Sequence, residues 1–252
     1  MATTKQRFQV LNDPALQQVL PKLRDICSQA ESCLESHWAK RIIGPDGSTP
    51  AQVDERLATF PYYANYEELA RLEMHAILAC SPPHPSAVPK RVAFIGSGPM
   101  PLTSLCLLRS LNDSGVRSPP DTTVLNIDCD QAAIDTSADL VRALGPYALG
   151  MEFKCADAAA SDCRDLREFN VVYVAALVGQ TQMEKEDIIL RVASRMKRGA
   201  LLVMRSAWGL RTCLYPELDI TASEEMRAAL RPCLVLHPYG EVVNSVVVAR
   251  VR

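Results

Sequence analysis

The chain has 252 residues, of which 48% are hydrophobic and 22% are charged, and its formal net charge is −2. This length suits one large domain, or a medium domain with a smaller one, and the apolar content excludes a disordered chain. The balance of 27 basic and 29 acidic residues, without a long basic run, argues against a dedicated nucleic-acid binder.

The sequence predicts neither a membrane partner nor secretion. Its longest apolar stretch, Val171–Val178, is far shorter than the ~20 residues of a spanning helix. The N-terminal residues contain no apolar segment of the kind found in signal peptides. Nine cysteines without a C-x-x-C pair favour reduced thiols over a disulfide framework or a zinc site. We therefore expect a cytoplasmic protein.

Helical signals dominate the N-terminal third. An Asn-Asp-Pro helix start predicts an amphipathic helix over about 13–40, which Pro21 is expected to bend or divide. A second helix is expected to begin near Pro50, and a third to run over 62–80. These elements predict an N-terminal helical cap domain comprising residues 1–88.

A different pattern begins after the proline-rich segment 81–85, which predicts a short stiff linker. Short Val-, Ile- and Leu-rich runs alternate with helical stretches, which is typical of βαβ units around a buried parallel sheet. The expected strands are 91–95, 123–127, 151–155, 171–175, 200–204, 233–236 and 242–251, and the expected helices are 102–111, 131–144 and 184–196. The last two strands predict a hairpin. Residues 89–252 are therefore expected to form an α/β domain with a class I methyltransferase-like Rossmann sheet, mostly parallel with an antiparallel C-terminal strand.

The first expected strand leads directly into the segment Gly96, Ser97, Gly98 and Pro99. Glycines at this strand end allow a ligand to approach the backbone, and the next helix offers free amide groups. Pro101 replaces the third glycine of the dinucleotide fingerprint, which allows close packing beside a pyrophosphate. The segment therefore fits S-adenosylmethionine, which has no pyrophosphate, better than NAD.

Two carboxylates follow at the ends of the next strands. Asp128 ends the second strand and can accept hydrogen bonds from both ribose hydroxyls of a nucleoside. Asp157 follows the third strand, where it is placed to meet an adenine amino group. Each residue alone could be a solvated loop carboxylate, but their positions at successive strand ends favour a nucleoside site.

Several sequence strings resemble those of nicotianamine synthases, in the same order: FPYYANYEELARLE, VAFIGSGPMPLTSL, NIDCD, VVYVAALVG, GALLVMRSAWGLRTCLYPELD and HPYGEVVNSVVVAR. The resemblance runs from about Phe60 to the C-terminus. It implies a transferase that condenses three S-adenosylmethionine molecules into nicotianamine and releases methylthioadenosine. Ala175 and Ala176 are expected to complete the donor site with the glycine-rich turn, Asp128 and Asp157. No metal is expected, because His37, His75 and His84 have no partners at metal-ligand spacing.

The third expected helix carries a candidate catalytic carboxylate. Glu73 lies seven residues after Tyr66 and four before Ile77, and this spacing puts it on the apolar stripe of the helix. Spacing alone leaves open whether Glu73 points to water or lines a cavity. The resemblance favours the cavity, because Glu73 matches the glutamate of the family's YxNYxxLxxLE pattern. It implies catalytic roles for Glu73, Tyr63 and Tyr66, and a substrate contact for Asn65.

The end of the fifth expected strand supplies candidate substrate-binding residues. Arg205 and Ser206 lie on the ligand edge of the sheet, where a guanidinium suits the carboxylate of an aminocarboxypropyl group. The familiar plant pattern RSAHG is RSAWG here, with Trp208 in the histidine position. If Trp208 borders the acceptor pocket, the acceptor or the number of transfers would differ. His237 and Asn244 flank the final hairpin, and structural roles are expected for them.

Three alternatives remain open at this point. The first is an opine-metallophore type of aminocarboxypropyl transferase with another acceptor, such as histidine. The second is a small-molecule methyltransferase that uses the same site, and the third is a ligand-binding protein without catalysis. The expected partners are small molecules, namely S-adenosylmethionine, reaction intermediates and methylthioadenosine, and the sequence leaves open whether the protein is a homodimer.

Overall fold

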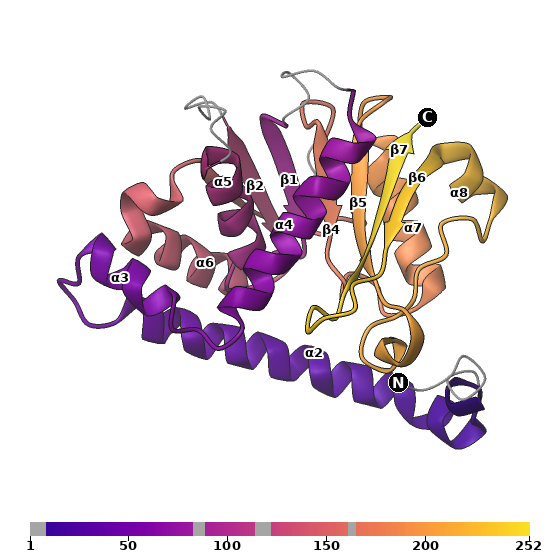
Figure 1. Ribbon diagram of the computed structural model, residues 1–252, viewed down its shortest axis with the longest axis horizontal. Coiled ribbons are helices and arrows are strands. Elements are labelled where there is room, and N and C mark those ends of the chain that lie inside the picture. Colours follow the sequence, from indigo (N-terminus) through magenta and orange to yellow (C-terminus); the bar gives the residue numbers. More distant parts are fainter. Residues whose placement is uncertain (1–8, 83–88, 114–121, 161–164) are drawn as a thin grey trace.

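The computed structural model describes residues 9–82, 89–113, 122–160 and 165–252. Its centre is a seven-stranded sheet in the order β3-β2-β1-β4-β5-β7-β6 (Figure 1). The strands are β1 Arg91–Ile95, β2 Thr123–Asp128, β3 Met151–Cys155, β4 Val171–Val174, β5 Leu201–Ser206, β6 Leu230–Leu236 and β7 Ser245–Val251. Strands β1 to β5 pair in parallel, and β7 is antiparallel to both of its neighbours. The predicted class I methyltransferase-like sheet is confirmed.

Different helices cover the two faces of the sheet, because successive strand residues point to opposite sides. Ile95 of β1 packs in a buried cluster with helix α7 (Gln182–Ser194). The adjacent Phe94 packs on the other face with α4 (Tyr63–Cys80) and α5 (Leu102–Asp113). Because both faces are covered, the central strands have continuous apolar runs instead of an alternating pattern.

The longest helix, α2 (Pro14–Ile43), passes below the sheet in the view of Figure 1. The Asp13 side chain begins it by accepting a hydrogen bond from the N–H of Ala15 at 2.8 Å. The helix continues through Pro21, so this residue does not divide it as the sequence suggested it could. A helix-interior proline costs about 3 kcal/mol, and burial of the adjacent Leu20 helps to offset that cost.

The N-terminal helices are in close contact with the sheet and its helices. Helix α3 (Pro50–Leu57) begins with a capping box at Thr49 and packs with α2 against α6 (Gln131–Leu144). Helix α4, in contrast, lies on a face of the sheet and contacts α5 and β7. Residues 83–88 of the expected linker region lie outside the described residues. The division into domains 1–88 and 89–252 therefore stays a prediction.

The C-terminal strands form the predicted hairpin, but their bounds differ from those expected. Strand β6 begins at Leu230, three residues before the predicted start, and β7 begins at Ser245. The chain before β7 belongs instead to a loop that reaches the cavity described below. The remaining short helices are η2 Gly145–Ala148, η3 Gly209–Cys213 and α8 Glu224–Ala229. Among the described helices, none combines the length and apolar character needed to cross a membrane.

Candidate active site

A cavity of about 960 Å³ lies at the carboxyl ends of the parallel strands. Strand order reverses there between β1 and β4, and ligands of open α/β sheets bind at such points. Helices α2 and α4 supply the wall opposite the strand ends. The lining residues come from segments far apart in the sequence. They fall within 28–35, 60–69, 94–104, 127–133, 156–158, 175–179 and 241–244, although not every residue of these ranges lines the cavity, and Ile188, Arg205 and Tyr215 join them.

The glycine-rich turn after β1 brings the strand edge into contact with α2. Gly96 and Gly98 have φ angles of 79° and 65°, a region that residues with a Cβ rarely adopt. A Cβ on Gly98 would lie 2.7 Å from Oε2 of Glu35, which is part of α2. Glycine at position 98 thus leaves the space that Glu35 needs to reach the cavity.

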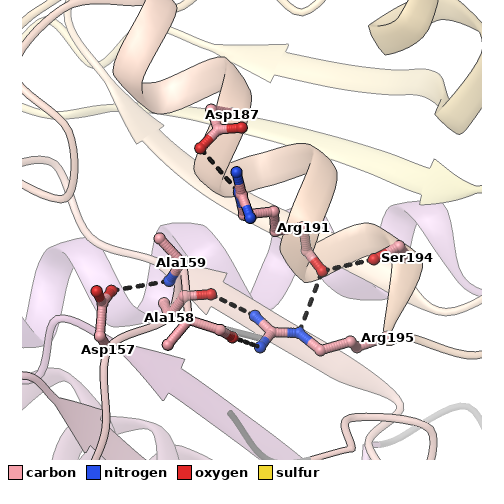
Figure 2. Close-up of polar contacts among 8 residues, drawn as sticks. Asp157, Ala158, Ala159, Asp187, Arg191, Ser194 and Arg195 are labelled. Atoms are coloured by element: carbon pink, nitrogen blue, oxygen red, sulfur yellow. Dashed lines mark hydrogen bonds and ion pairs between the residues drawn. The ribbon is translucent and has the colours of Figure 1, made fainter. Parts of the chain in front are cut away.

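The residues expected to bind the donor all lie in the cavity wall, in the glycine-rich turn, at Asp128 and Asp157, and at Ala175 and Ala176. The Asp128 carboxylate accepts hydrogen bonds from the N–H of Gly98 at 2.8 Å and that of Asp130 at 3.0 Å. Asp157 accepts one from the N–H of Ala159 at 2.8 Å (Figure 2). Backbone N–H groups therefore fix both carboxylates: those of Gly98 and Asp130 fix Asp128, and that of Ala159 fixes Asp157.

Two glutamates of α2 line the cavity, although the sequence patterns did not predict them as site residues. Glu35 accepts a hydrogen bond from the Tyr66 hydroxyl at 3.0 Å, and burial raises the pKa of its carboxyl to about 8. Glu31, one turn away, accepts one from the Tyr215 hydroxyl, and burial raises its pKa as well. Helical spacing is the signal that could have identified them. Residues 31, 35, 38 and 42 lie on one face of α2, and the full burial of Ile42 shows that this face is turned toward the protein.

Glu73 is fully buried, but it does not line the cavity. Its carboxylate accepts hydrogen bonds from Nε and Nη2 of Arg205 at 2.7 and 3.2 Å. Nη2 also donates to Thr103 Oγ1 at 2.7 Å. The expectation that Glu73 faces a cavity is therefore not met, because helical spacing predicts burial without identifying what the buried group contacts. Arg205 itself lies in the cavity wall, as expected.

The other sequence candidates are divided between the cavity and its surroundings. Asn65 and Tyr66 line the cavity, whereas Tyr63 does not and accepts a hydrogen bond from Arg109 at 2.8 Å. Ser206 also lies outside the cavity wall, and its hydroxyl accepts a hydrogen bond from the N–H of Leu218 at 2.9 Å. The side chains adjacent to Arg205 in the sequence thus do not share its position.

Trp208 lies outside the cavity wall, with 41% of its surface exposed. Its ring stacks on His237 with centroids 5.1 Å apart. Trp208 therefore does not border this cavity. Bordering the acceptor pocket was the condition under which Trp208 was expected to change the acceptor or the number of transfers. Asn244, for which only a structural role was expected, lines the cavity instead.

Two residues of the cavity wall carry buried polar atoms that have no hydrogen-bond partner among the described residues. These atoms are the hydroxyl of Ser97 and the amide nitrogen of Asn244. A buried polar group without a partner costs about 1–3 kcal/mol. Within the described ranges, no three His, Cys, Asp or Glu side chains are grouped to hold a metal ion. The absence of a metal stays a prediction.

Solved structures with a similar fold bind S-adenosylmethionine. A glutamate-to-glutamine mutant of MtNAS in complex with S-adenosylmethionine aligns with 99% of this chain and 84% of its own, with a TM-score of 0.75 and 22% identity. MtNAS in complex with MTA and tNA gives a TM-score of 0.74 and 23% identity, over 99% of this chain and 82% of its own. Magnesium protoporphyrin IX methyltransferase from Synechocystis PCC 6803 with bound SAM, with a TM-score of 0.53 and 14% identity, covers 84% of this chain and 88% of its own. At these identities the likeness concerns the fold alone.

Sequence relatives extend the comparison to the family level. Nicotianamine synthase 9 of Hordeum vulgare is 38% identical over 237 residues, which is 94% of this chain and 64% of the relative. Nicotianamine synthase of Solanum lycopersicum is 36% identical over 235 residues, 93% of this chain and 68% of the relative. The chain thus spans less than two thirds of the first barley relative. The profile of the family described as nicotianamine synthase protein matches residues 2–252, and the chain belongs to this family.

Proposed function

We propose that this chain is a nicotianamine synthase, a transferase that joins three S-adenosylmethionine molecules through 3-amino-3-carboxypropyl transfer and releases methylthioadenosine. Family membership supports the proposal. The observation that carries it is the presence, in one cavity, of a carboxyl group with a raised pKa, Glu35, beside the strand-end residues of the proposed nucleoside site. Arg205 adds a cation suited to the carboxylate of the transferred group.

At the nucleoside end, Asp128 is proposed to bind the ribose hydroxyls and Asp157 the adenine amino group. A carboxylate has about four acceptor sites, and the two backbone bonds of Asp128 leave sites for a ligand. The Ser97 hydroxyl supports this assignment, because it is buried in the same wall without a partner in the described part of the chain. Ala175 and Ala176 supply a wall without bulky side chains.

The aminocarboxypropyl end is assigned to Arg205, Asn65 and Asn244. Nε and Nη2 of Arg205 are held by Glu73 and Thr103, whereas Nη1 has no hydrogen bond among the described residues. A guanidinium fixed on one side and open on the other can bind a ligand carboxylate without losing much conformational freedom. We therefore assign Glu73 the role of orienting Arg205, in place of the catalytic role suggested by the sequence.

The reaction requires an uncharged amine in line with one particular carbon. The amine attacks the aminocarboxypropyl carbon bonded to the sulfonium sulfur; a C–N bond forms, the C–S bond breaks, and sulfur keeps the electron pair as methylthioadenosine leaves. Because an amine with a pKa near ~10 arrives protonated, a base must take its proton. Glu35 is proposed as this base, oriented by the Tyr66 hydroxyl, because a carboxyl with a pKa of about 8 accepts such a proton more readily than an ordinary glutamate.

The methyl and aminocarboxypropyl carbons are bonded to the same sulfur, so the product depends on which carbon faces the amine. In our proposal, Arg205 fixes the aminocarboxypropyl chain from the carboxylate end and Asp128 fixes the ribose. The sulfonium is then held between two anchored ends. Tyr63, Ser206 and Trp208 contact other protein groups outside the cavity wall, and we assign them supporting roles.

Product analysis tests the proposal most directly. The purified chain is incubated with S-adenosylmethionine, alone and with added histidine, and the products are identified by mass spectrometry. We expect methylthioadenosine together with a product of nicotianamine mass from S-adenosylmethionine alone. Methylthioadenosine that forms only with histidine would indicate the opine-type reaction, and S-adenosylhomocysteine would indicate methyl transfer. Binding without any product would indicate a ligand-binding protein. A cytoplasmic location stays a prediction, and whether the protein is a homodimer stays open.

A further inference from the structure

Helix α7 lies against the loops that form one side of the cavity, although only Ile188 of this helix lines the cavity itself. The helix begins with a capping box in which Thr181 and Glu184 bond to each other's backbone N–H groups. Two cations, Lys185 in its first turns and Arg195 at its C-cap, direct their side chains to backbone carbonyls of two cavity loops. We define these loops as residues 156–160 and 175–179.

Lys185 is buried beneath the loop 175–179, with only 1% of its surface exposed. Its Nζ donates hydrogen bonds to the carbonyls of Ala176 at 2.6 Å and Val178 at 2.9 Å. Burial lowers the pKa of its ammonium to about 7, with no contribution from a charged neighbour. A methionine would fill similar space without this desolvation, so the distinctive property of lysine at this site is its N–H donors.

The position of the loop 175–179 determines how closely the cavity walls approach each other. A Cβ on Gly96 would lie 2.4 Å from Cγ2 of Val178 and 3.1 Å from Cβ of Ala175. The loop thus packs directly on the glycine-rich turn, and its Ala175 N–H donates to the carbonyl of Ile95 at 3.0 Å. A shift of this loop would change the space available beside the glycine-rich turn.

Arg195 bonds to the other loop in the same way (Figure 2). Its guanidinium donates to the carbonyls of Ala158 and of residue 160, the latter at 3.0 Å, while Nε donates to the Arg191 carbonyl at 3.1 Å. Asp157, the proposed adenine-binding residue, lies on this loop immediately before Ala158. Figure 2 shows that the Arg191 side chain points away from the loop and pairs with Asp187.

We propose that Lys185 and Arg195 are positioning residues that hold the loops 175–179 and 156–160 in the conformation that binds the adenosine part of the ligand. The inference rests on the proposed function for the identity of that ligand. The contacts themselves do not depend on it, because each is a hydrogen bond between a side chain of α7 and a carbonyl of this chain. Neither side chain is placed to touch the reacting atoms.

Single substitutions to methionine test the two residues separately. Lys185→Met and Arg195→Met remove the donors and keep unbranched apolar stems, and Arg191→Met is the control, because it removes a cation from the outer face of the same helix. Binding of S-adenosylmethionine and of methylthioadenosine is measured by calorimetry. We expect each Kd to rise about tenfold in both test variants and to change less than twofold in the control. In turnover assays, KM for the donor should rise while kcat stays within about twofold.

Hydrogen exchange of the ligand-free proteins separates this inference from the proposed function. In Lys185→Met, amides of the loop 175–179 should exchange at least tenfold faster, while those of 156–160 are unchanged. In Arg195→Met, amides of 156–160 should exchange at least tenfold faster, while those of 175–179 are unchanged. Neither loop should change in the control Arg191→Met. If wild type binds neither ligand, the proposed function fails, and local exchange still decides whether the cations hold the loops. Unchanged Kd, KM and loop exchange in the folded variants would overturn the inference. If Lys185→Met does not fold, the half-buried Arg195 provides the same test at its own loop.

Discussion

Replacing Glu73 with glutamine distinguishes a buried partner of Arg205 from a catalytic base. The carboxylate is fully buried and accepts two hydrogen bonds from Arg205, at 2.7 and 3.2 Å. Glutamine keeps the size and one acceptor oxygen but removes the negative charge. The guanidinium would then stay buried without a counter-charge, and the new amide group would present N–H donors to it.

The expected loss of stability is large for a conservative substitution. Removing one partner of a buried ion pair lowers the free energy of unfolding by about 3–5 kcal/mol. The whole free energy of unfolding of a typical protein is about 5–15 kcal/mol. In a chain of this size, 1 kcal/mol corresponds to about 2–4 °C in Tm, so we expect Tm of Glu73→Gln to fall by about 6–20 °C. Urea unfolding followed by circular dichroism measures the free energy, and calorimetry measures the transition temperature.

The double variant Glu73→Gln/Arg205→Met is the control for this interpretation. Removing the buried cation as well should restore much of the stability lost in Glu73→Gln, because the uncompensated charge is gone. Turnover should stay low in the double variant, because Arg205 is the proposed carboxylate-binding group. A single variant with wild-type stability, normal donor binding and abolished turnover would contradict the ion-pair role and restore Glu73 as the base.

Four further outcomes are expected. Glu35→Gln should retain donor binding and lower kcat by about 10²–10⁴-fold, measured by release of methylthioadenosine; a variant with wild-type kcat would exclude Glu35 as the base. Burial raises the pKa of Glu35 from 4.5 to about 8. The contribution of this group to the free energy of unfolding is therefore complete below pH 4.5 and is lost as the pH rises to about 8. Urea unfolding across this range should show a fall in the free energy of unfolding that Glu35→Gln lacks. Asp128→Ala should weaken S-adenosylmethionine binding about 10–150-fold, from the 1.5–3 kcal/mol of a hydrogen bond to a charged group, and unchanged calorimetric affinity would remove it from the ribose site. Trp208→His should leave the product spectrum unaltered, because this side chain lies outside the cavity wall; a new product by mass spectrometry would show that the position acts on the acceptor.

Local sequence patterns were sufficient to predict the strands that carry the proposed nucleoside site. The alternation of apolar runs and helical stretches predicted the strands before Gly96, Asp128 and Asp157, and all these residues lie at the cavity. In a parallel sheet, the carboxyl ends of the strands meet at one edge, so chain order and strand assignment bring such residues together. The prediction succeeded here because the relevant geometry repeats in every sheet of this class.

The same reasoning could not assign the charged residues of the helices. Glu73 and Glu35 both occupy buried or partly buried helical positions, yet one pairs with Arg205 and the other reaches the cavity past Gly98. Helical periodicity gives the face on which a residue lies, but the group opposite that face comes from another part of the chain. Arg205 lies 132 residues from Glu73 in the sequence, and no local pattern connects them.

Local sequence patterns predicted strands β1 to β5, the longer helices, the glycine-rich turn and the strand-end carboxylates, because each depends on residues within a few positions of one another. The resemblance of its motifs also indicated the family to which the chain belongs. Three arrangements came from tertiary packing: Glu35 instead of Glu73 faces the cavity, Trp208 stacks on His237 outside it, and the α7 cations hold carbonyls of two cavity loops. Those arrangements follow from how α2, α4 and α7 pack on the sheet, and packing depends on residues far apart in the chain.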